Sequence, residues 1–358
     1  MIVSIKRSTS ITSEKRNAAM PSTASRPAVG IIIGDPAGIG PEVVAKAWLT
    51  GQLHQTCRPL LIGSAAVMER ALKFIRKDAS IHVLTDEAEV PETLVDRHDT
   101  FDILDTGTLV SEVIPLGEDT VTGGNVSGVW LDQGDRLART GQLAATVMGP
   151  ISTGSMKMAG TLERVVSVET GKSYLILVSG PLRIAHLTDH IPLRRVCEII
   201  SQDLVLMALR QIDSAMREWG LRTPRIAVAG LNPHAMGEED QNSIALAVQS
   251  ARKDGINVVG PISPDTVFRH CIEGRYDLVL AMYHDQGHIA IKTWGFSGNI
   301  AIILGPPYVH LSVAHGTAYD IVGKGVADHT MILNAIQTAG YLAAGKGFPT
   351  SASVKAGE

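Results

Sequence analysis

The stretch AVGIIIGDPAGIGPEVVAKAW, residues 28–48, decides the fold. Its first part, residues 28–33, is a short apolar run of the kind expected for a buried strand. The glycine-rich turn GDPAGIG follows, and Pro41 stands where the first turn of a helix tolerates proline. An apolar-periodic segment then begins at Val43. The order of strand, glycine turn and helix predicts the opening unit of an α/β fold.

The same alternation continues along the chain. Further strands are expected over residues 59–62, 144–148, 174–178, 184–187, 225–229, 278–282 and 300–304, and helices over 65–75, 132–143, 193–217, 242–254 and 330–344. Residues 78–122 form a polar, variable region. Repeated β-α units predict mostly parallel, doubly wound sheets. A chain of 358 residues is too long for one ordinary core, so we expect two α/β domains.

The composition excludes several classes of protein. The formal net charge of -4 gives no strong basic field for a nucleic-acid backbone. No apolar run approaches the roughly 18 residues of a membrane span. The three scattered cysteines, Cys57, Cys197 and Cys271, provide neither a disulfide framework nor a zinc–cysteine site, and they fit a reducing cytosol. We therefore expect a cytoplasmic protein that binds a small molecule, without a nucleic-acid or membrane partner.

Residues 1–26 differ from the rest, because they are rich in Ser, Thr, Lys and Arg. We expect this segment to be a disordered tail or a consequence of an upstream start codon, since Met20 offers a second start. A transit peptide is a weaker alternative.

Three histidines fall just past predicted strands: His190, His234 and His284. Ligands of open α/β sheets gather at the carboxyl ends of strands. Three neutral imidazoles suit zinc or another borderline divalent ion, which would polarise an alcohol or a ketone. The alternative is that each histidine is a polar loop residue or a helix cap. His186 and His288 are close enough in sequence to be the ligands instead.

Two aspartates accompany these histidines. Asp265 and Asp285 can join the metal ligands, orient a histidine or cap a helix, and the sequence leaves these roles open.

The segment HGTAYDIVGKGVAD, residues 315–328, is a second candidate ligand loop. Its glycines permit close backbone approach. His315 can stack on or bond an adenine, and Asp320 can bond a ribose. The GxxxGxG spacing of GDPAGIG is a weak phosphate-loop signal, and a plain turn between strand and helix explains it equally well.

Together these motifs resemble the 4-hydroxythreonine-4-phosphate dehydrogenase family. The matching blocks are GDPAGIGPE, TDHIPLR, GLNPHA with EED, GPISPDTVF, AMYHDQGHIAIK and SVAHGTAYDIVGKGVAD. The resemblance implies a two-domain α/β/α sandwich like that of isocitrate and isopropylmalate dehydrogenases. It places the nucleotide side in residues 27–149 plus 308–358, and metal, substrate and dimerisation in residues 150–307. It also implies a homodimer with the site at the subunit interface.

The resemblance further implies NAD, although the sequence does not decide between NAD and NADP. It implies one divalent metal per subunit, zinc first, with magnesium, manganese or cobalt as alternatives. The reaction is oxidation of a secondary alcohol followed by loss of CO2. The family's metal ligands fall on His190, His234 and His284, and its active-site lysine on Lys292, with Asp285 and Asp265 as further catalytic candidates. The expected nucleotide contacts are His315, Gly316, Thr317, Ala318, Asp320, Gly323 and Lys324.

The chain departs from the family where substrate phosphate is held. The PxNK motif reads PIST at residues 150–153, the GHTE block is missing, and the phosphate-binding Asn and Arg fall on Ala301 and His310. A phosphate dianion needs several charge-assisted donors. We therefore expect a substrate without phosphate, as in the similar terephthalate cis-dihydrodiol dehydrogenase branch. His310, Lys172 and Arg164 are candidates to receive its distal carboxylate.

Three functions follow from these observations. The first is NAD-linked oxidative decarboxylation of terephthalate 1,2-cis-dihydrodiol to protocatechuate. The second is oxidation of 4-hydroxythreonine 4-phosphate or a threonate phosphate through a rebuilt phosphate site. The third is a non-catalytic binding protein, which retention of the histidines and Lys292 disfavours.

Overall fold

The computed structural model describes residues 26–105, 107, 114–295 and 299–349. The predicted tail lies outside these residues except for Arg26, which belongs to the fold. Its side chain is buried and donates to Asp96 Oδ2 at 2.6 Å and to the Cys57 carbonyl at 3.1 Å. The folded part therefore begins at or before Arg26.

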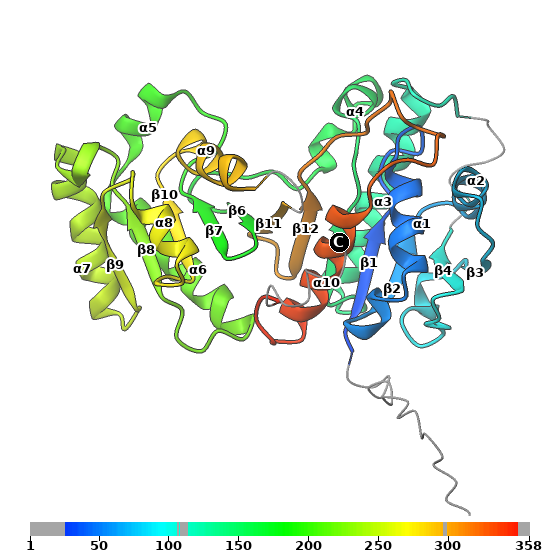
Figure 1. Ribbon diagram of the computed structural model, residues 1–358, viewed down its shortest axis with the longest axis horizontal. Coiled ribbons are helices and arrows are strands. Elements are labelled where there is room, and N and C mark those ends of the chain that lie inside the picture. The colour runs from blue at the N-terminus through cyan, green and yellow to red at the C-terminus, as the bar shows by residue number, and fades with distance from the viewer. Residues whose placement is uncertain (1–25, 106, 108–113, 296–298, 350–358) are drawn as a thin grey trace, which may run out of the picture.

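Among the described residues, one continuous sheet of twelve strands runs in the order β3-β4-β2-β1-β5-β12-β11-β6-β7-β10-β8-β9. The strands are β1 Ala28–Ile32, β2 Arg58–Ile62, β3 Ser80–Leu84, β4 Thr100–Leu104, β5 Ala145–Met148, β6 Tyr174–Ser179, β7 Leu182–His186, β8 Ile226–Ala229, β9 Val258–Ile262, β10 Leu278–Ala281, β11 Ile300–Leu304 and β12 Val309–Val313. We call β1–β5 with β12 the β1 half of the sheet, and β6–β11 the β6 half. Figure 1 shows them as two lobes that meet at β11 and β12.

The sheet is mostly parallel. Antiparallel pairing is confined to its middle, where β11 pairs with β12 and β6, and β6 pairs with β7. The predicted mostly parallel α/β fold is confirmed. Two strands, β3 and β4, lie inside the region that the sequence marked only as polar and variable.

Helices cover the sheet in both lobes (Figure 1). They are α1 Gly40–Leu49, α2 Ala65–Ile75, α3 Val121–Arg139, α4 Thr153–Ala159, α5 Leu193–Ile199, α6 Gln202–Glu218, α7 Ala245–Lys253, α8 Val267–Ile272, α9 His284–Trp294 and α10 Thr330–Ala343. The predicted helix over residues 193–217 is two helices, because the Ser201 side chain accepts from the Leu204 amide and starts α6 afresh. Helix α3 begins eleven residues earlier than expected, at Val121.

The early start of α3 depends on a close approach to α4. A side chain at Gly124 would overlap the backbone carbonyl of Ser155. The glycines that resemble helix breakers in the sequence therefore let α3 pack directly against α4. This contact fixes α4, which follows the carboxyl end of β5, against the β1 half of the sheet.

Candidate active site

The carboxyl ends of β7 and β10 hold the principal cluster of ligand-type side chains. These strands are parallel neighbours, so the turn after β7 and the start of α9 lie side by side. Asp189, His190 and His284 each offer one ligand atom there, and these atoms all lie within 4.8 Å of one another. Two imidazoles and a carboxylate fit a divalent metal by their chemistry. We call these three residues the metal cluster.

A carboxylate orients one histidine of the metal cluster, and a second carboxylate lies beside the other. His190 Nδ1 lies 2.9 Å from Asp189 Oδ2, and His284 Nδ1 lies 2.7 Å from Asp285 Oδ1. The hydrogen bond from His284 lowers the pKa of the Asp285 carboxyl. An imidazole that donates through Nδ1 keeps the lone pair of Nε2 for a metal. The sequence left open whether Asp285 binds a metal, orients a histidine or caps a helix, and its bond to His284 fits the orienting role.

His234 does not join the metal cluster within this chain. It lies in the loop after β8, the other neighbour of β10, so it reaches the same edge of the sheet. Its side chain is exposed and its backbone has a φ of +54°. The sequence predicted three histidines together, whereas the structure brings together two histidines and Asp189, a residue that sequence reasoning missed.

His186 and His288 pack behind the metal cluster. The His288 ring stacks on the His284 ring with centroids 3.6 Å apart and an interplanar angle of 14°. Its Nδ1 donates to the His284 carbonyl at 3.1 Å. Burial lowers the pKa of His186 to about 3 and that of His288 to about 4, so both are neutral near pH 7. These two histidines support the ring of His284 and are not themselves in the cluster.

The remaining catalytic candidates differ in position. Lys292 is exposed on α9, about two helical turns after His284. Asp265 is exposed before α8 and accepts from Ser263 Oγ at 2.6 Å. That local bond is typical of a turn, and the structure does not bring Asp265 to the metal cluster within one chain.

The two glycine-rich segments meet at the carboxyl end of β1. The Ile39 amide donates to the Thr317 carbonyl at 3.0 Å, and a side chain at Gly38 would crowd Thr317. Lys46 Nζ donates to the carbonyls of Gly325 and Ala327 at 2.9 and 2.7 Å. The turn after β1 and helix α1 therefore hold residues 315–328 in place by hydrogen bonds.

Tyr319 fastens the same loop to two carboxylates. Its hydroxyl lies 2.8 Å from Asp35 Oδ2 and 3.0 Å from Asp119 Oδ1. Ser155 contacts both carboxylates, and Ser152 bonds Asp119. Burial raises the pKa of the Asp35 carboxyl, and nearby Asp119 adds to the rise. Sequence reasoning missed this contact, because four separate segments form it.

Of the predicted nucleotide-binding residues, Thr317 contacts the turn after β1, and the others are exposed or partly buried in the same loop. A methyl group at Gly316 would meet no atom within 4 Å, so the backbone there is open to a ligand. Asp320 and Lys324 are exposed, and His315 Nδ1 donates to the Gly316 carbonyl at 2.9 Å. Ala318 has a φ of +44° at the turn toward Tyr319. Thr317 and Gly323 are partly buried, the former beside Gly38.

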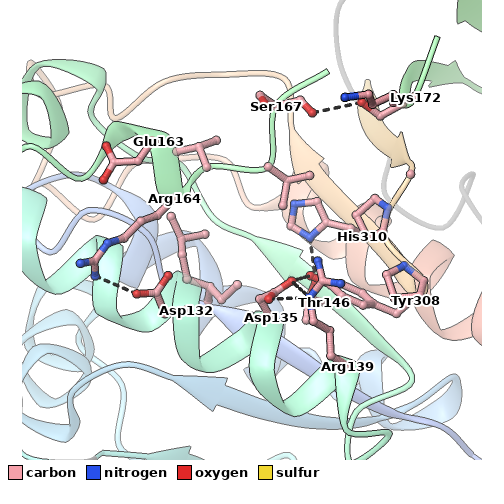
Figure 2. Close-up of a pocket in the computed structure, with 18 residues that line it drawn as sticks. Asp132, Asp135, Arg139, Thr146, Glu163, Arg164, Ser167, Lys172, Tyr308 and His310 are labelled. Carbon is pink, nitrogen blue, oxygen red and sulfur yellow. Dashed lines mark hydrogen bonds and ion pairs between the residues drawn. The ribbon is translucent and has the colours of Figure 1, made fainter. Parts of the chain in front are cut away.

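A cavity of about 420 Å³ lies beside α3, β5 and β12, and it contains the three predicted substrate residues. Figure 2 shows His310, Lys172 and Arg164 around it. His310 is buried, its Nδ1 lies 2.7 Å from Thr146 Oγ1, and burial lowers its pKa to about 4. We call this space the substrate cavity, after the three substrate residues that the sequence predicted and that line it.

The cations of the substrate cavity are already paired with carboxylates. Arg164 contacts Asp132 at 2.8 Å, and Lys172 contacts Glu169 at 2.7 Å. Arg139 contacts Asp135 at 2.7 Å, and Tyr308 also donates to that aspartate. Ala301 is buried in an apolar cluster on the neighbouring strand β11. The cavity thus presents a neutral imidazole and paired charges.

Comparison with known proteins identifies the family. The chain has the fold and the histidine–carboxylate cluster of a metal-dependent α/β enzyme. A family model described as pyridoxal phosphate biosynthetic protein PdxA matches residues 55–339. The chain belongs to the PdxA family, and it is an NAD-dependent decarboxylating dehydrogenase that acts on a CH–OH group. This confirms the predicted class of enzyme and the family that the motifs resemble.

Several relatives cover nearly all of the folded chain. A Novosphingobium aromaticivorans protein, provisionally named a 4-hydroxythreonine-4-phosphate dehydrogenase, is 59% identical over 330 residues, 91% of this chain and 99% of the relative. A Symbiobacterium thermophilum protein, provisionally named a D-threonate 4-phosphate dehydrogenase, is 36% identical over 331 residues, 89% of this chain and 98% of the relative.

Solved structures give the same family. The 4-hydroxythreonine-4-phosphate dehydrogenase of Klebsiella pneumoniae superimposes with a TM-score of 0.79 at 31% identity, covering 89% of this chain and 98% of its own. A terephthalate 1,2-cis-dihydrodiol dehydrogenase of Burkholderia xenovorans gives 0.66 at 28% identity, covering 88% and 98%. The comparisons therefore favour the phosphorylated alternative over the dihydrodiol branch that the missing phosphate motifs suggested.

No helix in the described part of the chain combines the length and apolar character needed to cross a bilayer.

Proposed function

We propose that this enzyme oxidises and decarboxylates a four-carbon hydroxy acid phosphate, of the 4-hydroxythreonine 4-phosphate or D-threonate 4-phosphate type. The names of the two relatives above support this substrate class. The observation that carries the chemistry is the metal cluster, in which His284 starts the helix that bears Lys292 and lies close to His190 and Asp189.

Each side chain of the site has a proposed role. His190 and His284 hold the divalent ion, zinc first, and Asp285 keeps His284 oriented. When bound, the ion supplies Lewis acidity for the reacting hydroxyl and for the enolate left by CO2, and NAD accepts hydride. Lys292 binds a substrate carboxylate or moves a proton at the reacting hydroxyl. Residues 315–325, with His315, Asp320 and Lys324, hold the nucleotide.

We also propose that the site is completed in a homodimer. The exposed His234 lies at the correct edge of the sheet but outside the cluster of its own chain, so a second subunit would supply it. In this arrangement residues 150–307 form the metal and dimer domain, and residues 27–149 with 308–358 form the nucleotide domain. Strand membership supports this division, since β6–β11 come from one continuous segment.

A second substrate is a candidate because of the lining of the substrate cavity. The neutral His310 and the paired cations suit a substrate such as terephthalate 1,2-cis-dihydrodiol better than a phosphate dianion. Aromatisation to the catechol would then drive the reaction.

One experiment separates these substrates. Purified protein with NAD and zinc is offered 4-hydroxythreonine 4-phosphate, D-threonate 4-phosphate and the terephthalate dihydrodiol separately, and NADH and CO2 are measured together. We expect both products in equal amounts from a phosphorylated acid. Turnover of the dihydrodiol alone would contradict the phosphorylated substrate and support the second candidate. Formation of NADH without CO2 would contradict decarboxylation.

A further inference from the structure

One carboxylate oxygen of the metal cluster lacks a hydrogen-bond partner. Asp189 Oδ2 lies 2.9 Å from His190 Nδ1, and Asp189 Oδ1 is buried and has no hydrogen-bond partner among the described residues. A buried carboxylate oxygen without a donor or a cation costs free energy. A cation bound at Oδ1 would offset this cost.

The matching aspartate on the other histidine is in a different environment. Both carboxylates lie close to an imidazole Nδ1, yet the Asp285 side chain is 71% exposed and the Asp189 side chain only 13%. Water can satisfy the second oxygen of Asp285. Asp189 Oδ1 is enclosed, and the ligand atoms of His190 and His284 lie within 4.8 Å of those of Asp189.

The surroundings of His284 hold this geometry in place. The stacked ring of His288 limits the rotation of His284, and a side chain at Gly287 would overlap the ring of buried His186. The ring of His284 is therefore held toward His190, with centroids 4.8 Å apart. A cation between these rings would also face Asp189.

We propose that Asp189 is itself a ligand of the divalent metal, so that one chain supplies two imidazoles and a carboxylate. The inference rests on the proposed function only in that a divalent metal binds at this cluster. An anionic oxygen ligand makes the site more tolerant of oxygen-preferring ions such as Mn²⁺ than a site of histidines alone.

The test compares two asparagine variants of the full-length protein after metal removal. Asp189→Asn keeps a carbonyl oxygen for His190 Nδ1 but removes the anionic oxygen, and Asp285→Asn is the matched change on His284. Zn²⁺ affinity is measured by competition with a chelator, and Co²⁺ binding by its visible absorption, which reports the ligands directly. Circular dichroism checks the fold, and Asp189→Ser replaces the asparagine variant if that variant does not fold.

We expect Asp189→Asn to weaken Zn²⁺ binding at least tenfold more than Asp285→Asn, whose loss should stay within the roughly 10–100-fold typical of an orienting partner. The Co²⁺ spectrum should change in Asp189→Asn and not in Asp285→Asn. Equal losses with an unchanged spectrum would overturn the proposal, since Asp189 would then only orient His190. Because no substrate is used, a wild-type protein that binds Co²⁺ but turns over no candidate substrate contradicts the proposed function alone.

Discussion

The metal cluster and the substrate cavity differ in what they retain of the family's chemistry. The cluster keeps two motif histidines, and Asp285 bonds one of them, His284. The cavity presents a buried neutral imidazole, His310, and cations that are already paired with carboxylates. The side chains of the metal cluster follow β7 and β10, and much of the cavity lining lies on α3, β5 and β12. Because the two regions lie on separate elements, a substitution in the cavity can leave the metal cluster undisturbed.

The largest effect is expected from His284→Ala, which tests whether the metal cluster is the indispensable region. Loss of one imidazole should remove bound zinc and lower kcat/KM roughly 10³-fold or more, since several kcal/mol of charge stabilisation disappears. Metal content and initial rates measure the effect, with exposed His98→Ala as the control. Full activity in a metal-free variant would show that the cluster is misassigned.

The next test concerns the charge of the substrate cavity. His310 has a folded-state pKa of about 4, below the ordinary value of 6.5. As pH falls below 6.5 the unfolded chain takes up this proton first, so stability present at pH 7 is lost progressively down to about pH 4. The contribution of His310 should be about 3 kcal/mol.

Urea unfolding of wild type and His310→Gln between pH 7 and pH 4 measures this contribution. Buried His186 titrates in both proteins, so the difference between them isolates His310. A difference that is constant with pH would mean that His310 is not held neutral, and the contrast between the two regions would lose its main support.

His310→Arg tests whether the substrate cavity influences the choice of substrate. A guanidinium at this position has Asp135 nearby as a counter-charge and offers paired donors to a phosphate. We expect the ratio of kcat/KM for a phosphorylated acid to that for the dihydrodiol to rise about tenfold, the equivalent of one charge-assisted bond. Steady-state kinetics measure the ratio, and His310→Gln is the neutral control. An unchanged ratio would show that the substrate cavity does not determine which substrate the enzyme prefers.

The smallest effect is expected at the loop of residues 315–328. Tyr319→Phe removes the hydroxyl between Asp35 and Asp119, and one lost hydrogen bond costs about 1 kcal/mol. The Kd for NADH should rise about fivefold while kcat at saturation stays within twofold. Fluorescence titration checks this, with Tyr341→Phe as the control. A fall in kcat at unchanged Kd would place Tyr319 in the chemical step.

Much of the fold was predictable where apolar periodicity is undisturbed. Helix α2 matches its predicted range of 65–75, and β1 with α1 follows the opening motif. Edge strand β3 was missed because most of its side chains stay partly exposed and carry no clear pattern. The start of α3 was missed because its glycines serve a helix contact that the sequence does not display.

The part of the site that lies at the carboxyl ends of strands was predictable from the sequence. His190 and His284 follow neighbouring parallel strands, and that rule suffices to bring them together. Asp189 was missed because its burial, not its residue type, distinguishes it from other loop aspartates. The position of His234 outside the cluster was not predictable, because a strand-end rule says nothing about which subunit faces which.

The continuous sheet also determines the order in which the protein can assemble during synthesis. Thr146 and His310 are partners across β5 and β12, yet they are 164 residues apart in the chain. Strand β12 and helix α10 leave the ribosome after all of β6–β11. Until β12 is made, the edge of β5 in the β1 half has no partner strand, whereas all strands of the β6 half can already pair with one another. Such unpaired edges invite wrong pairing. The part of the molecule made first is thus the part completed last.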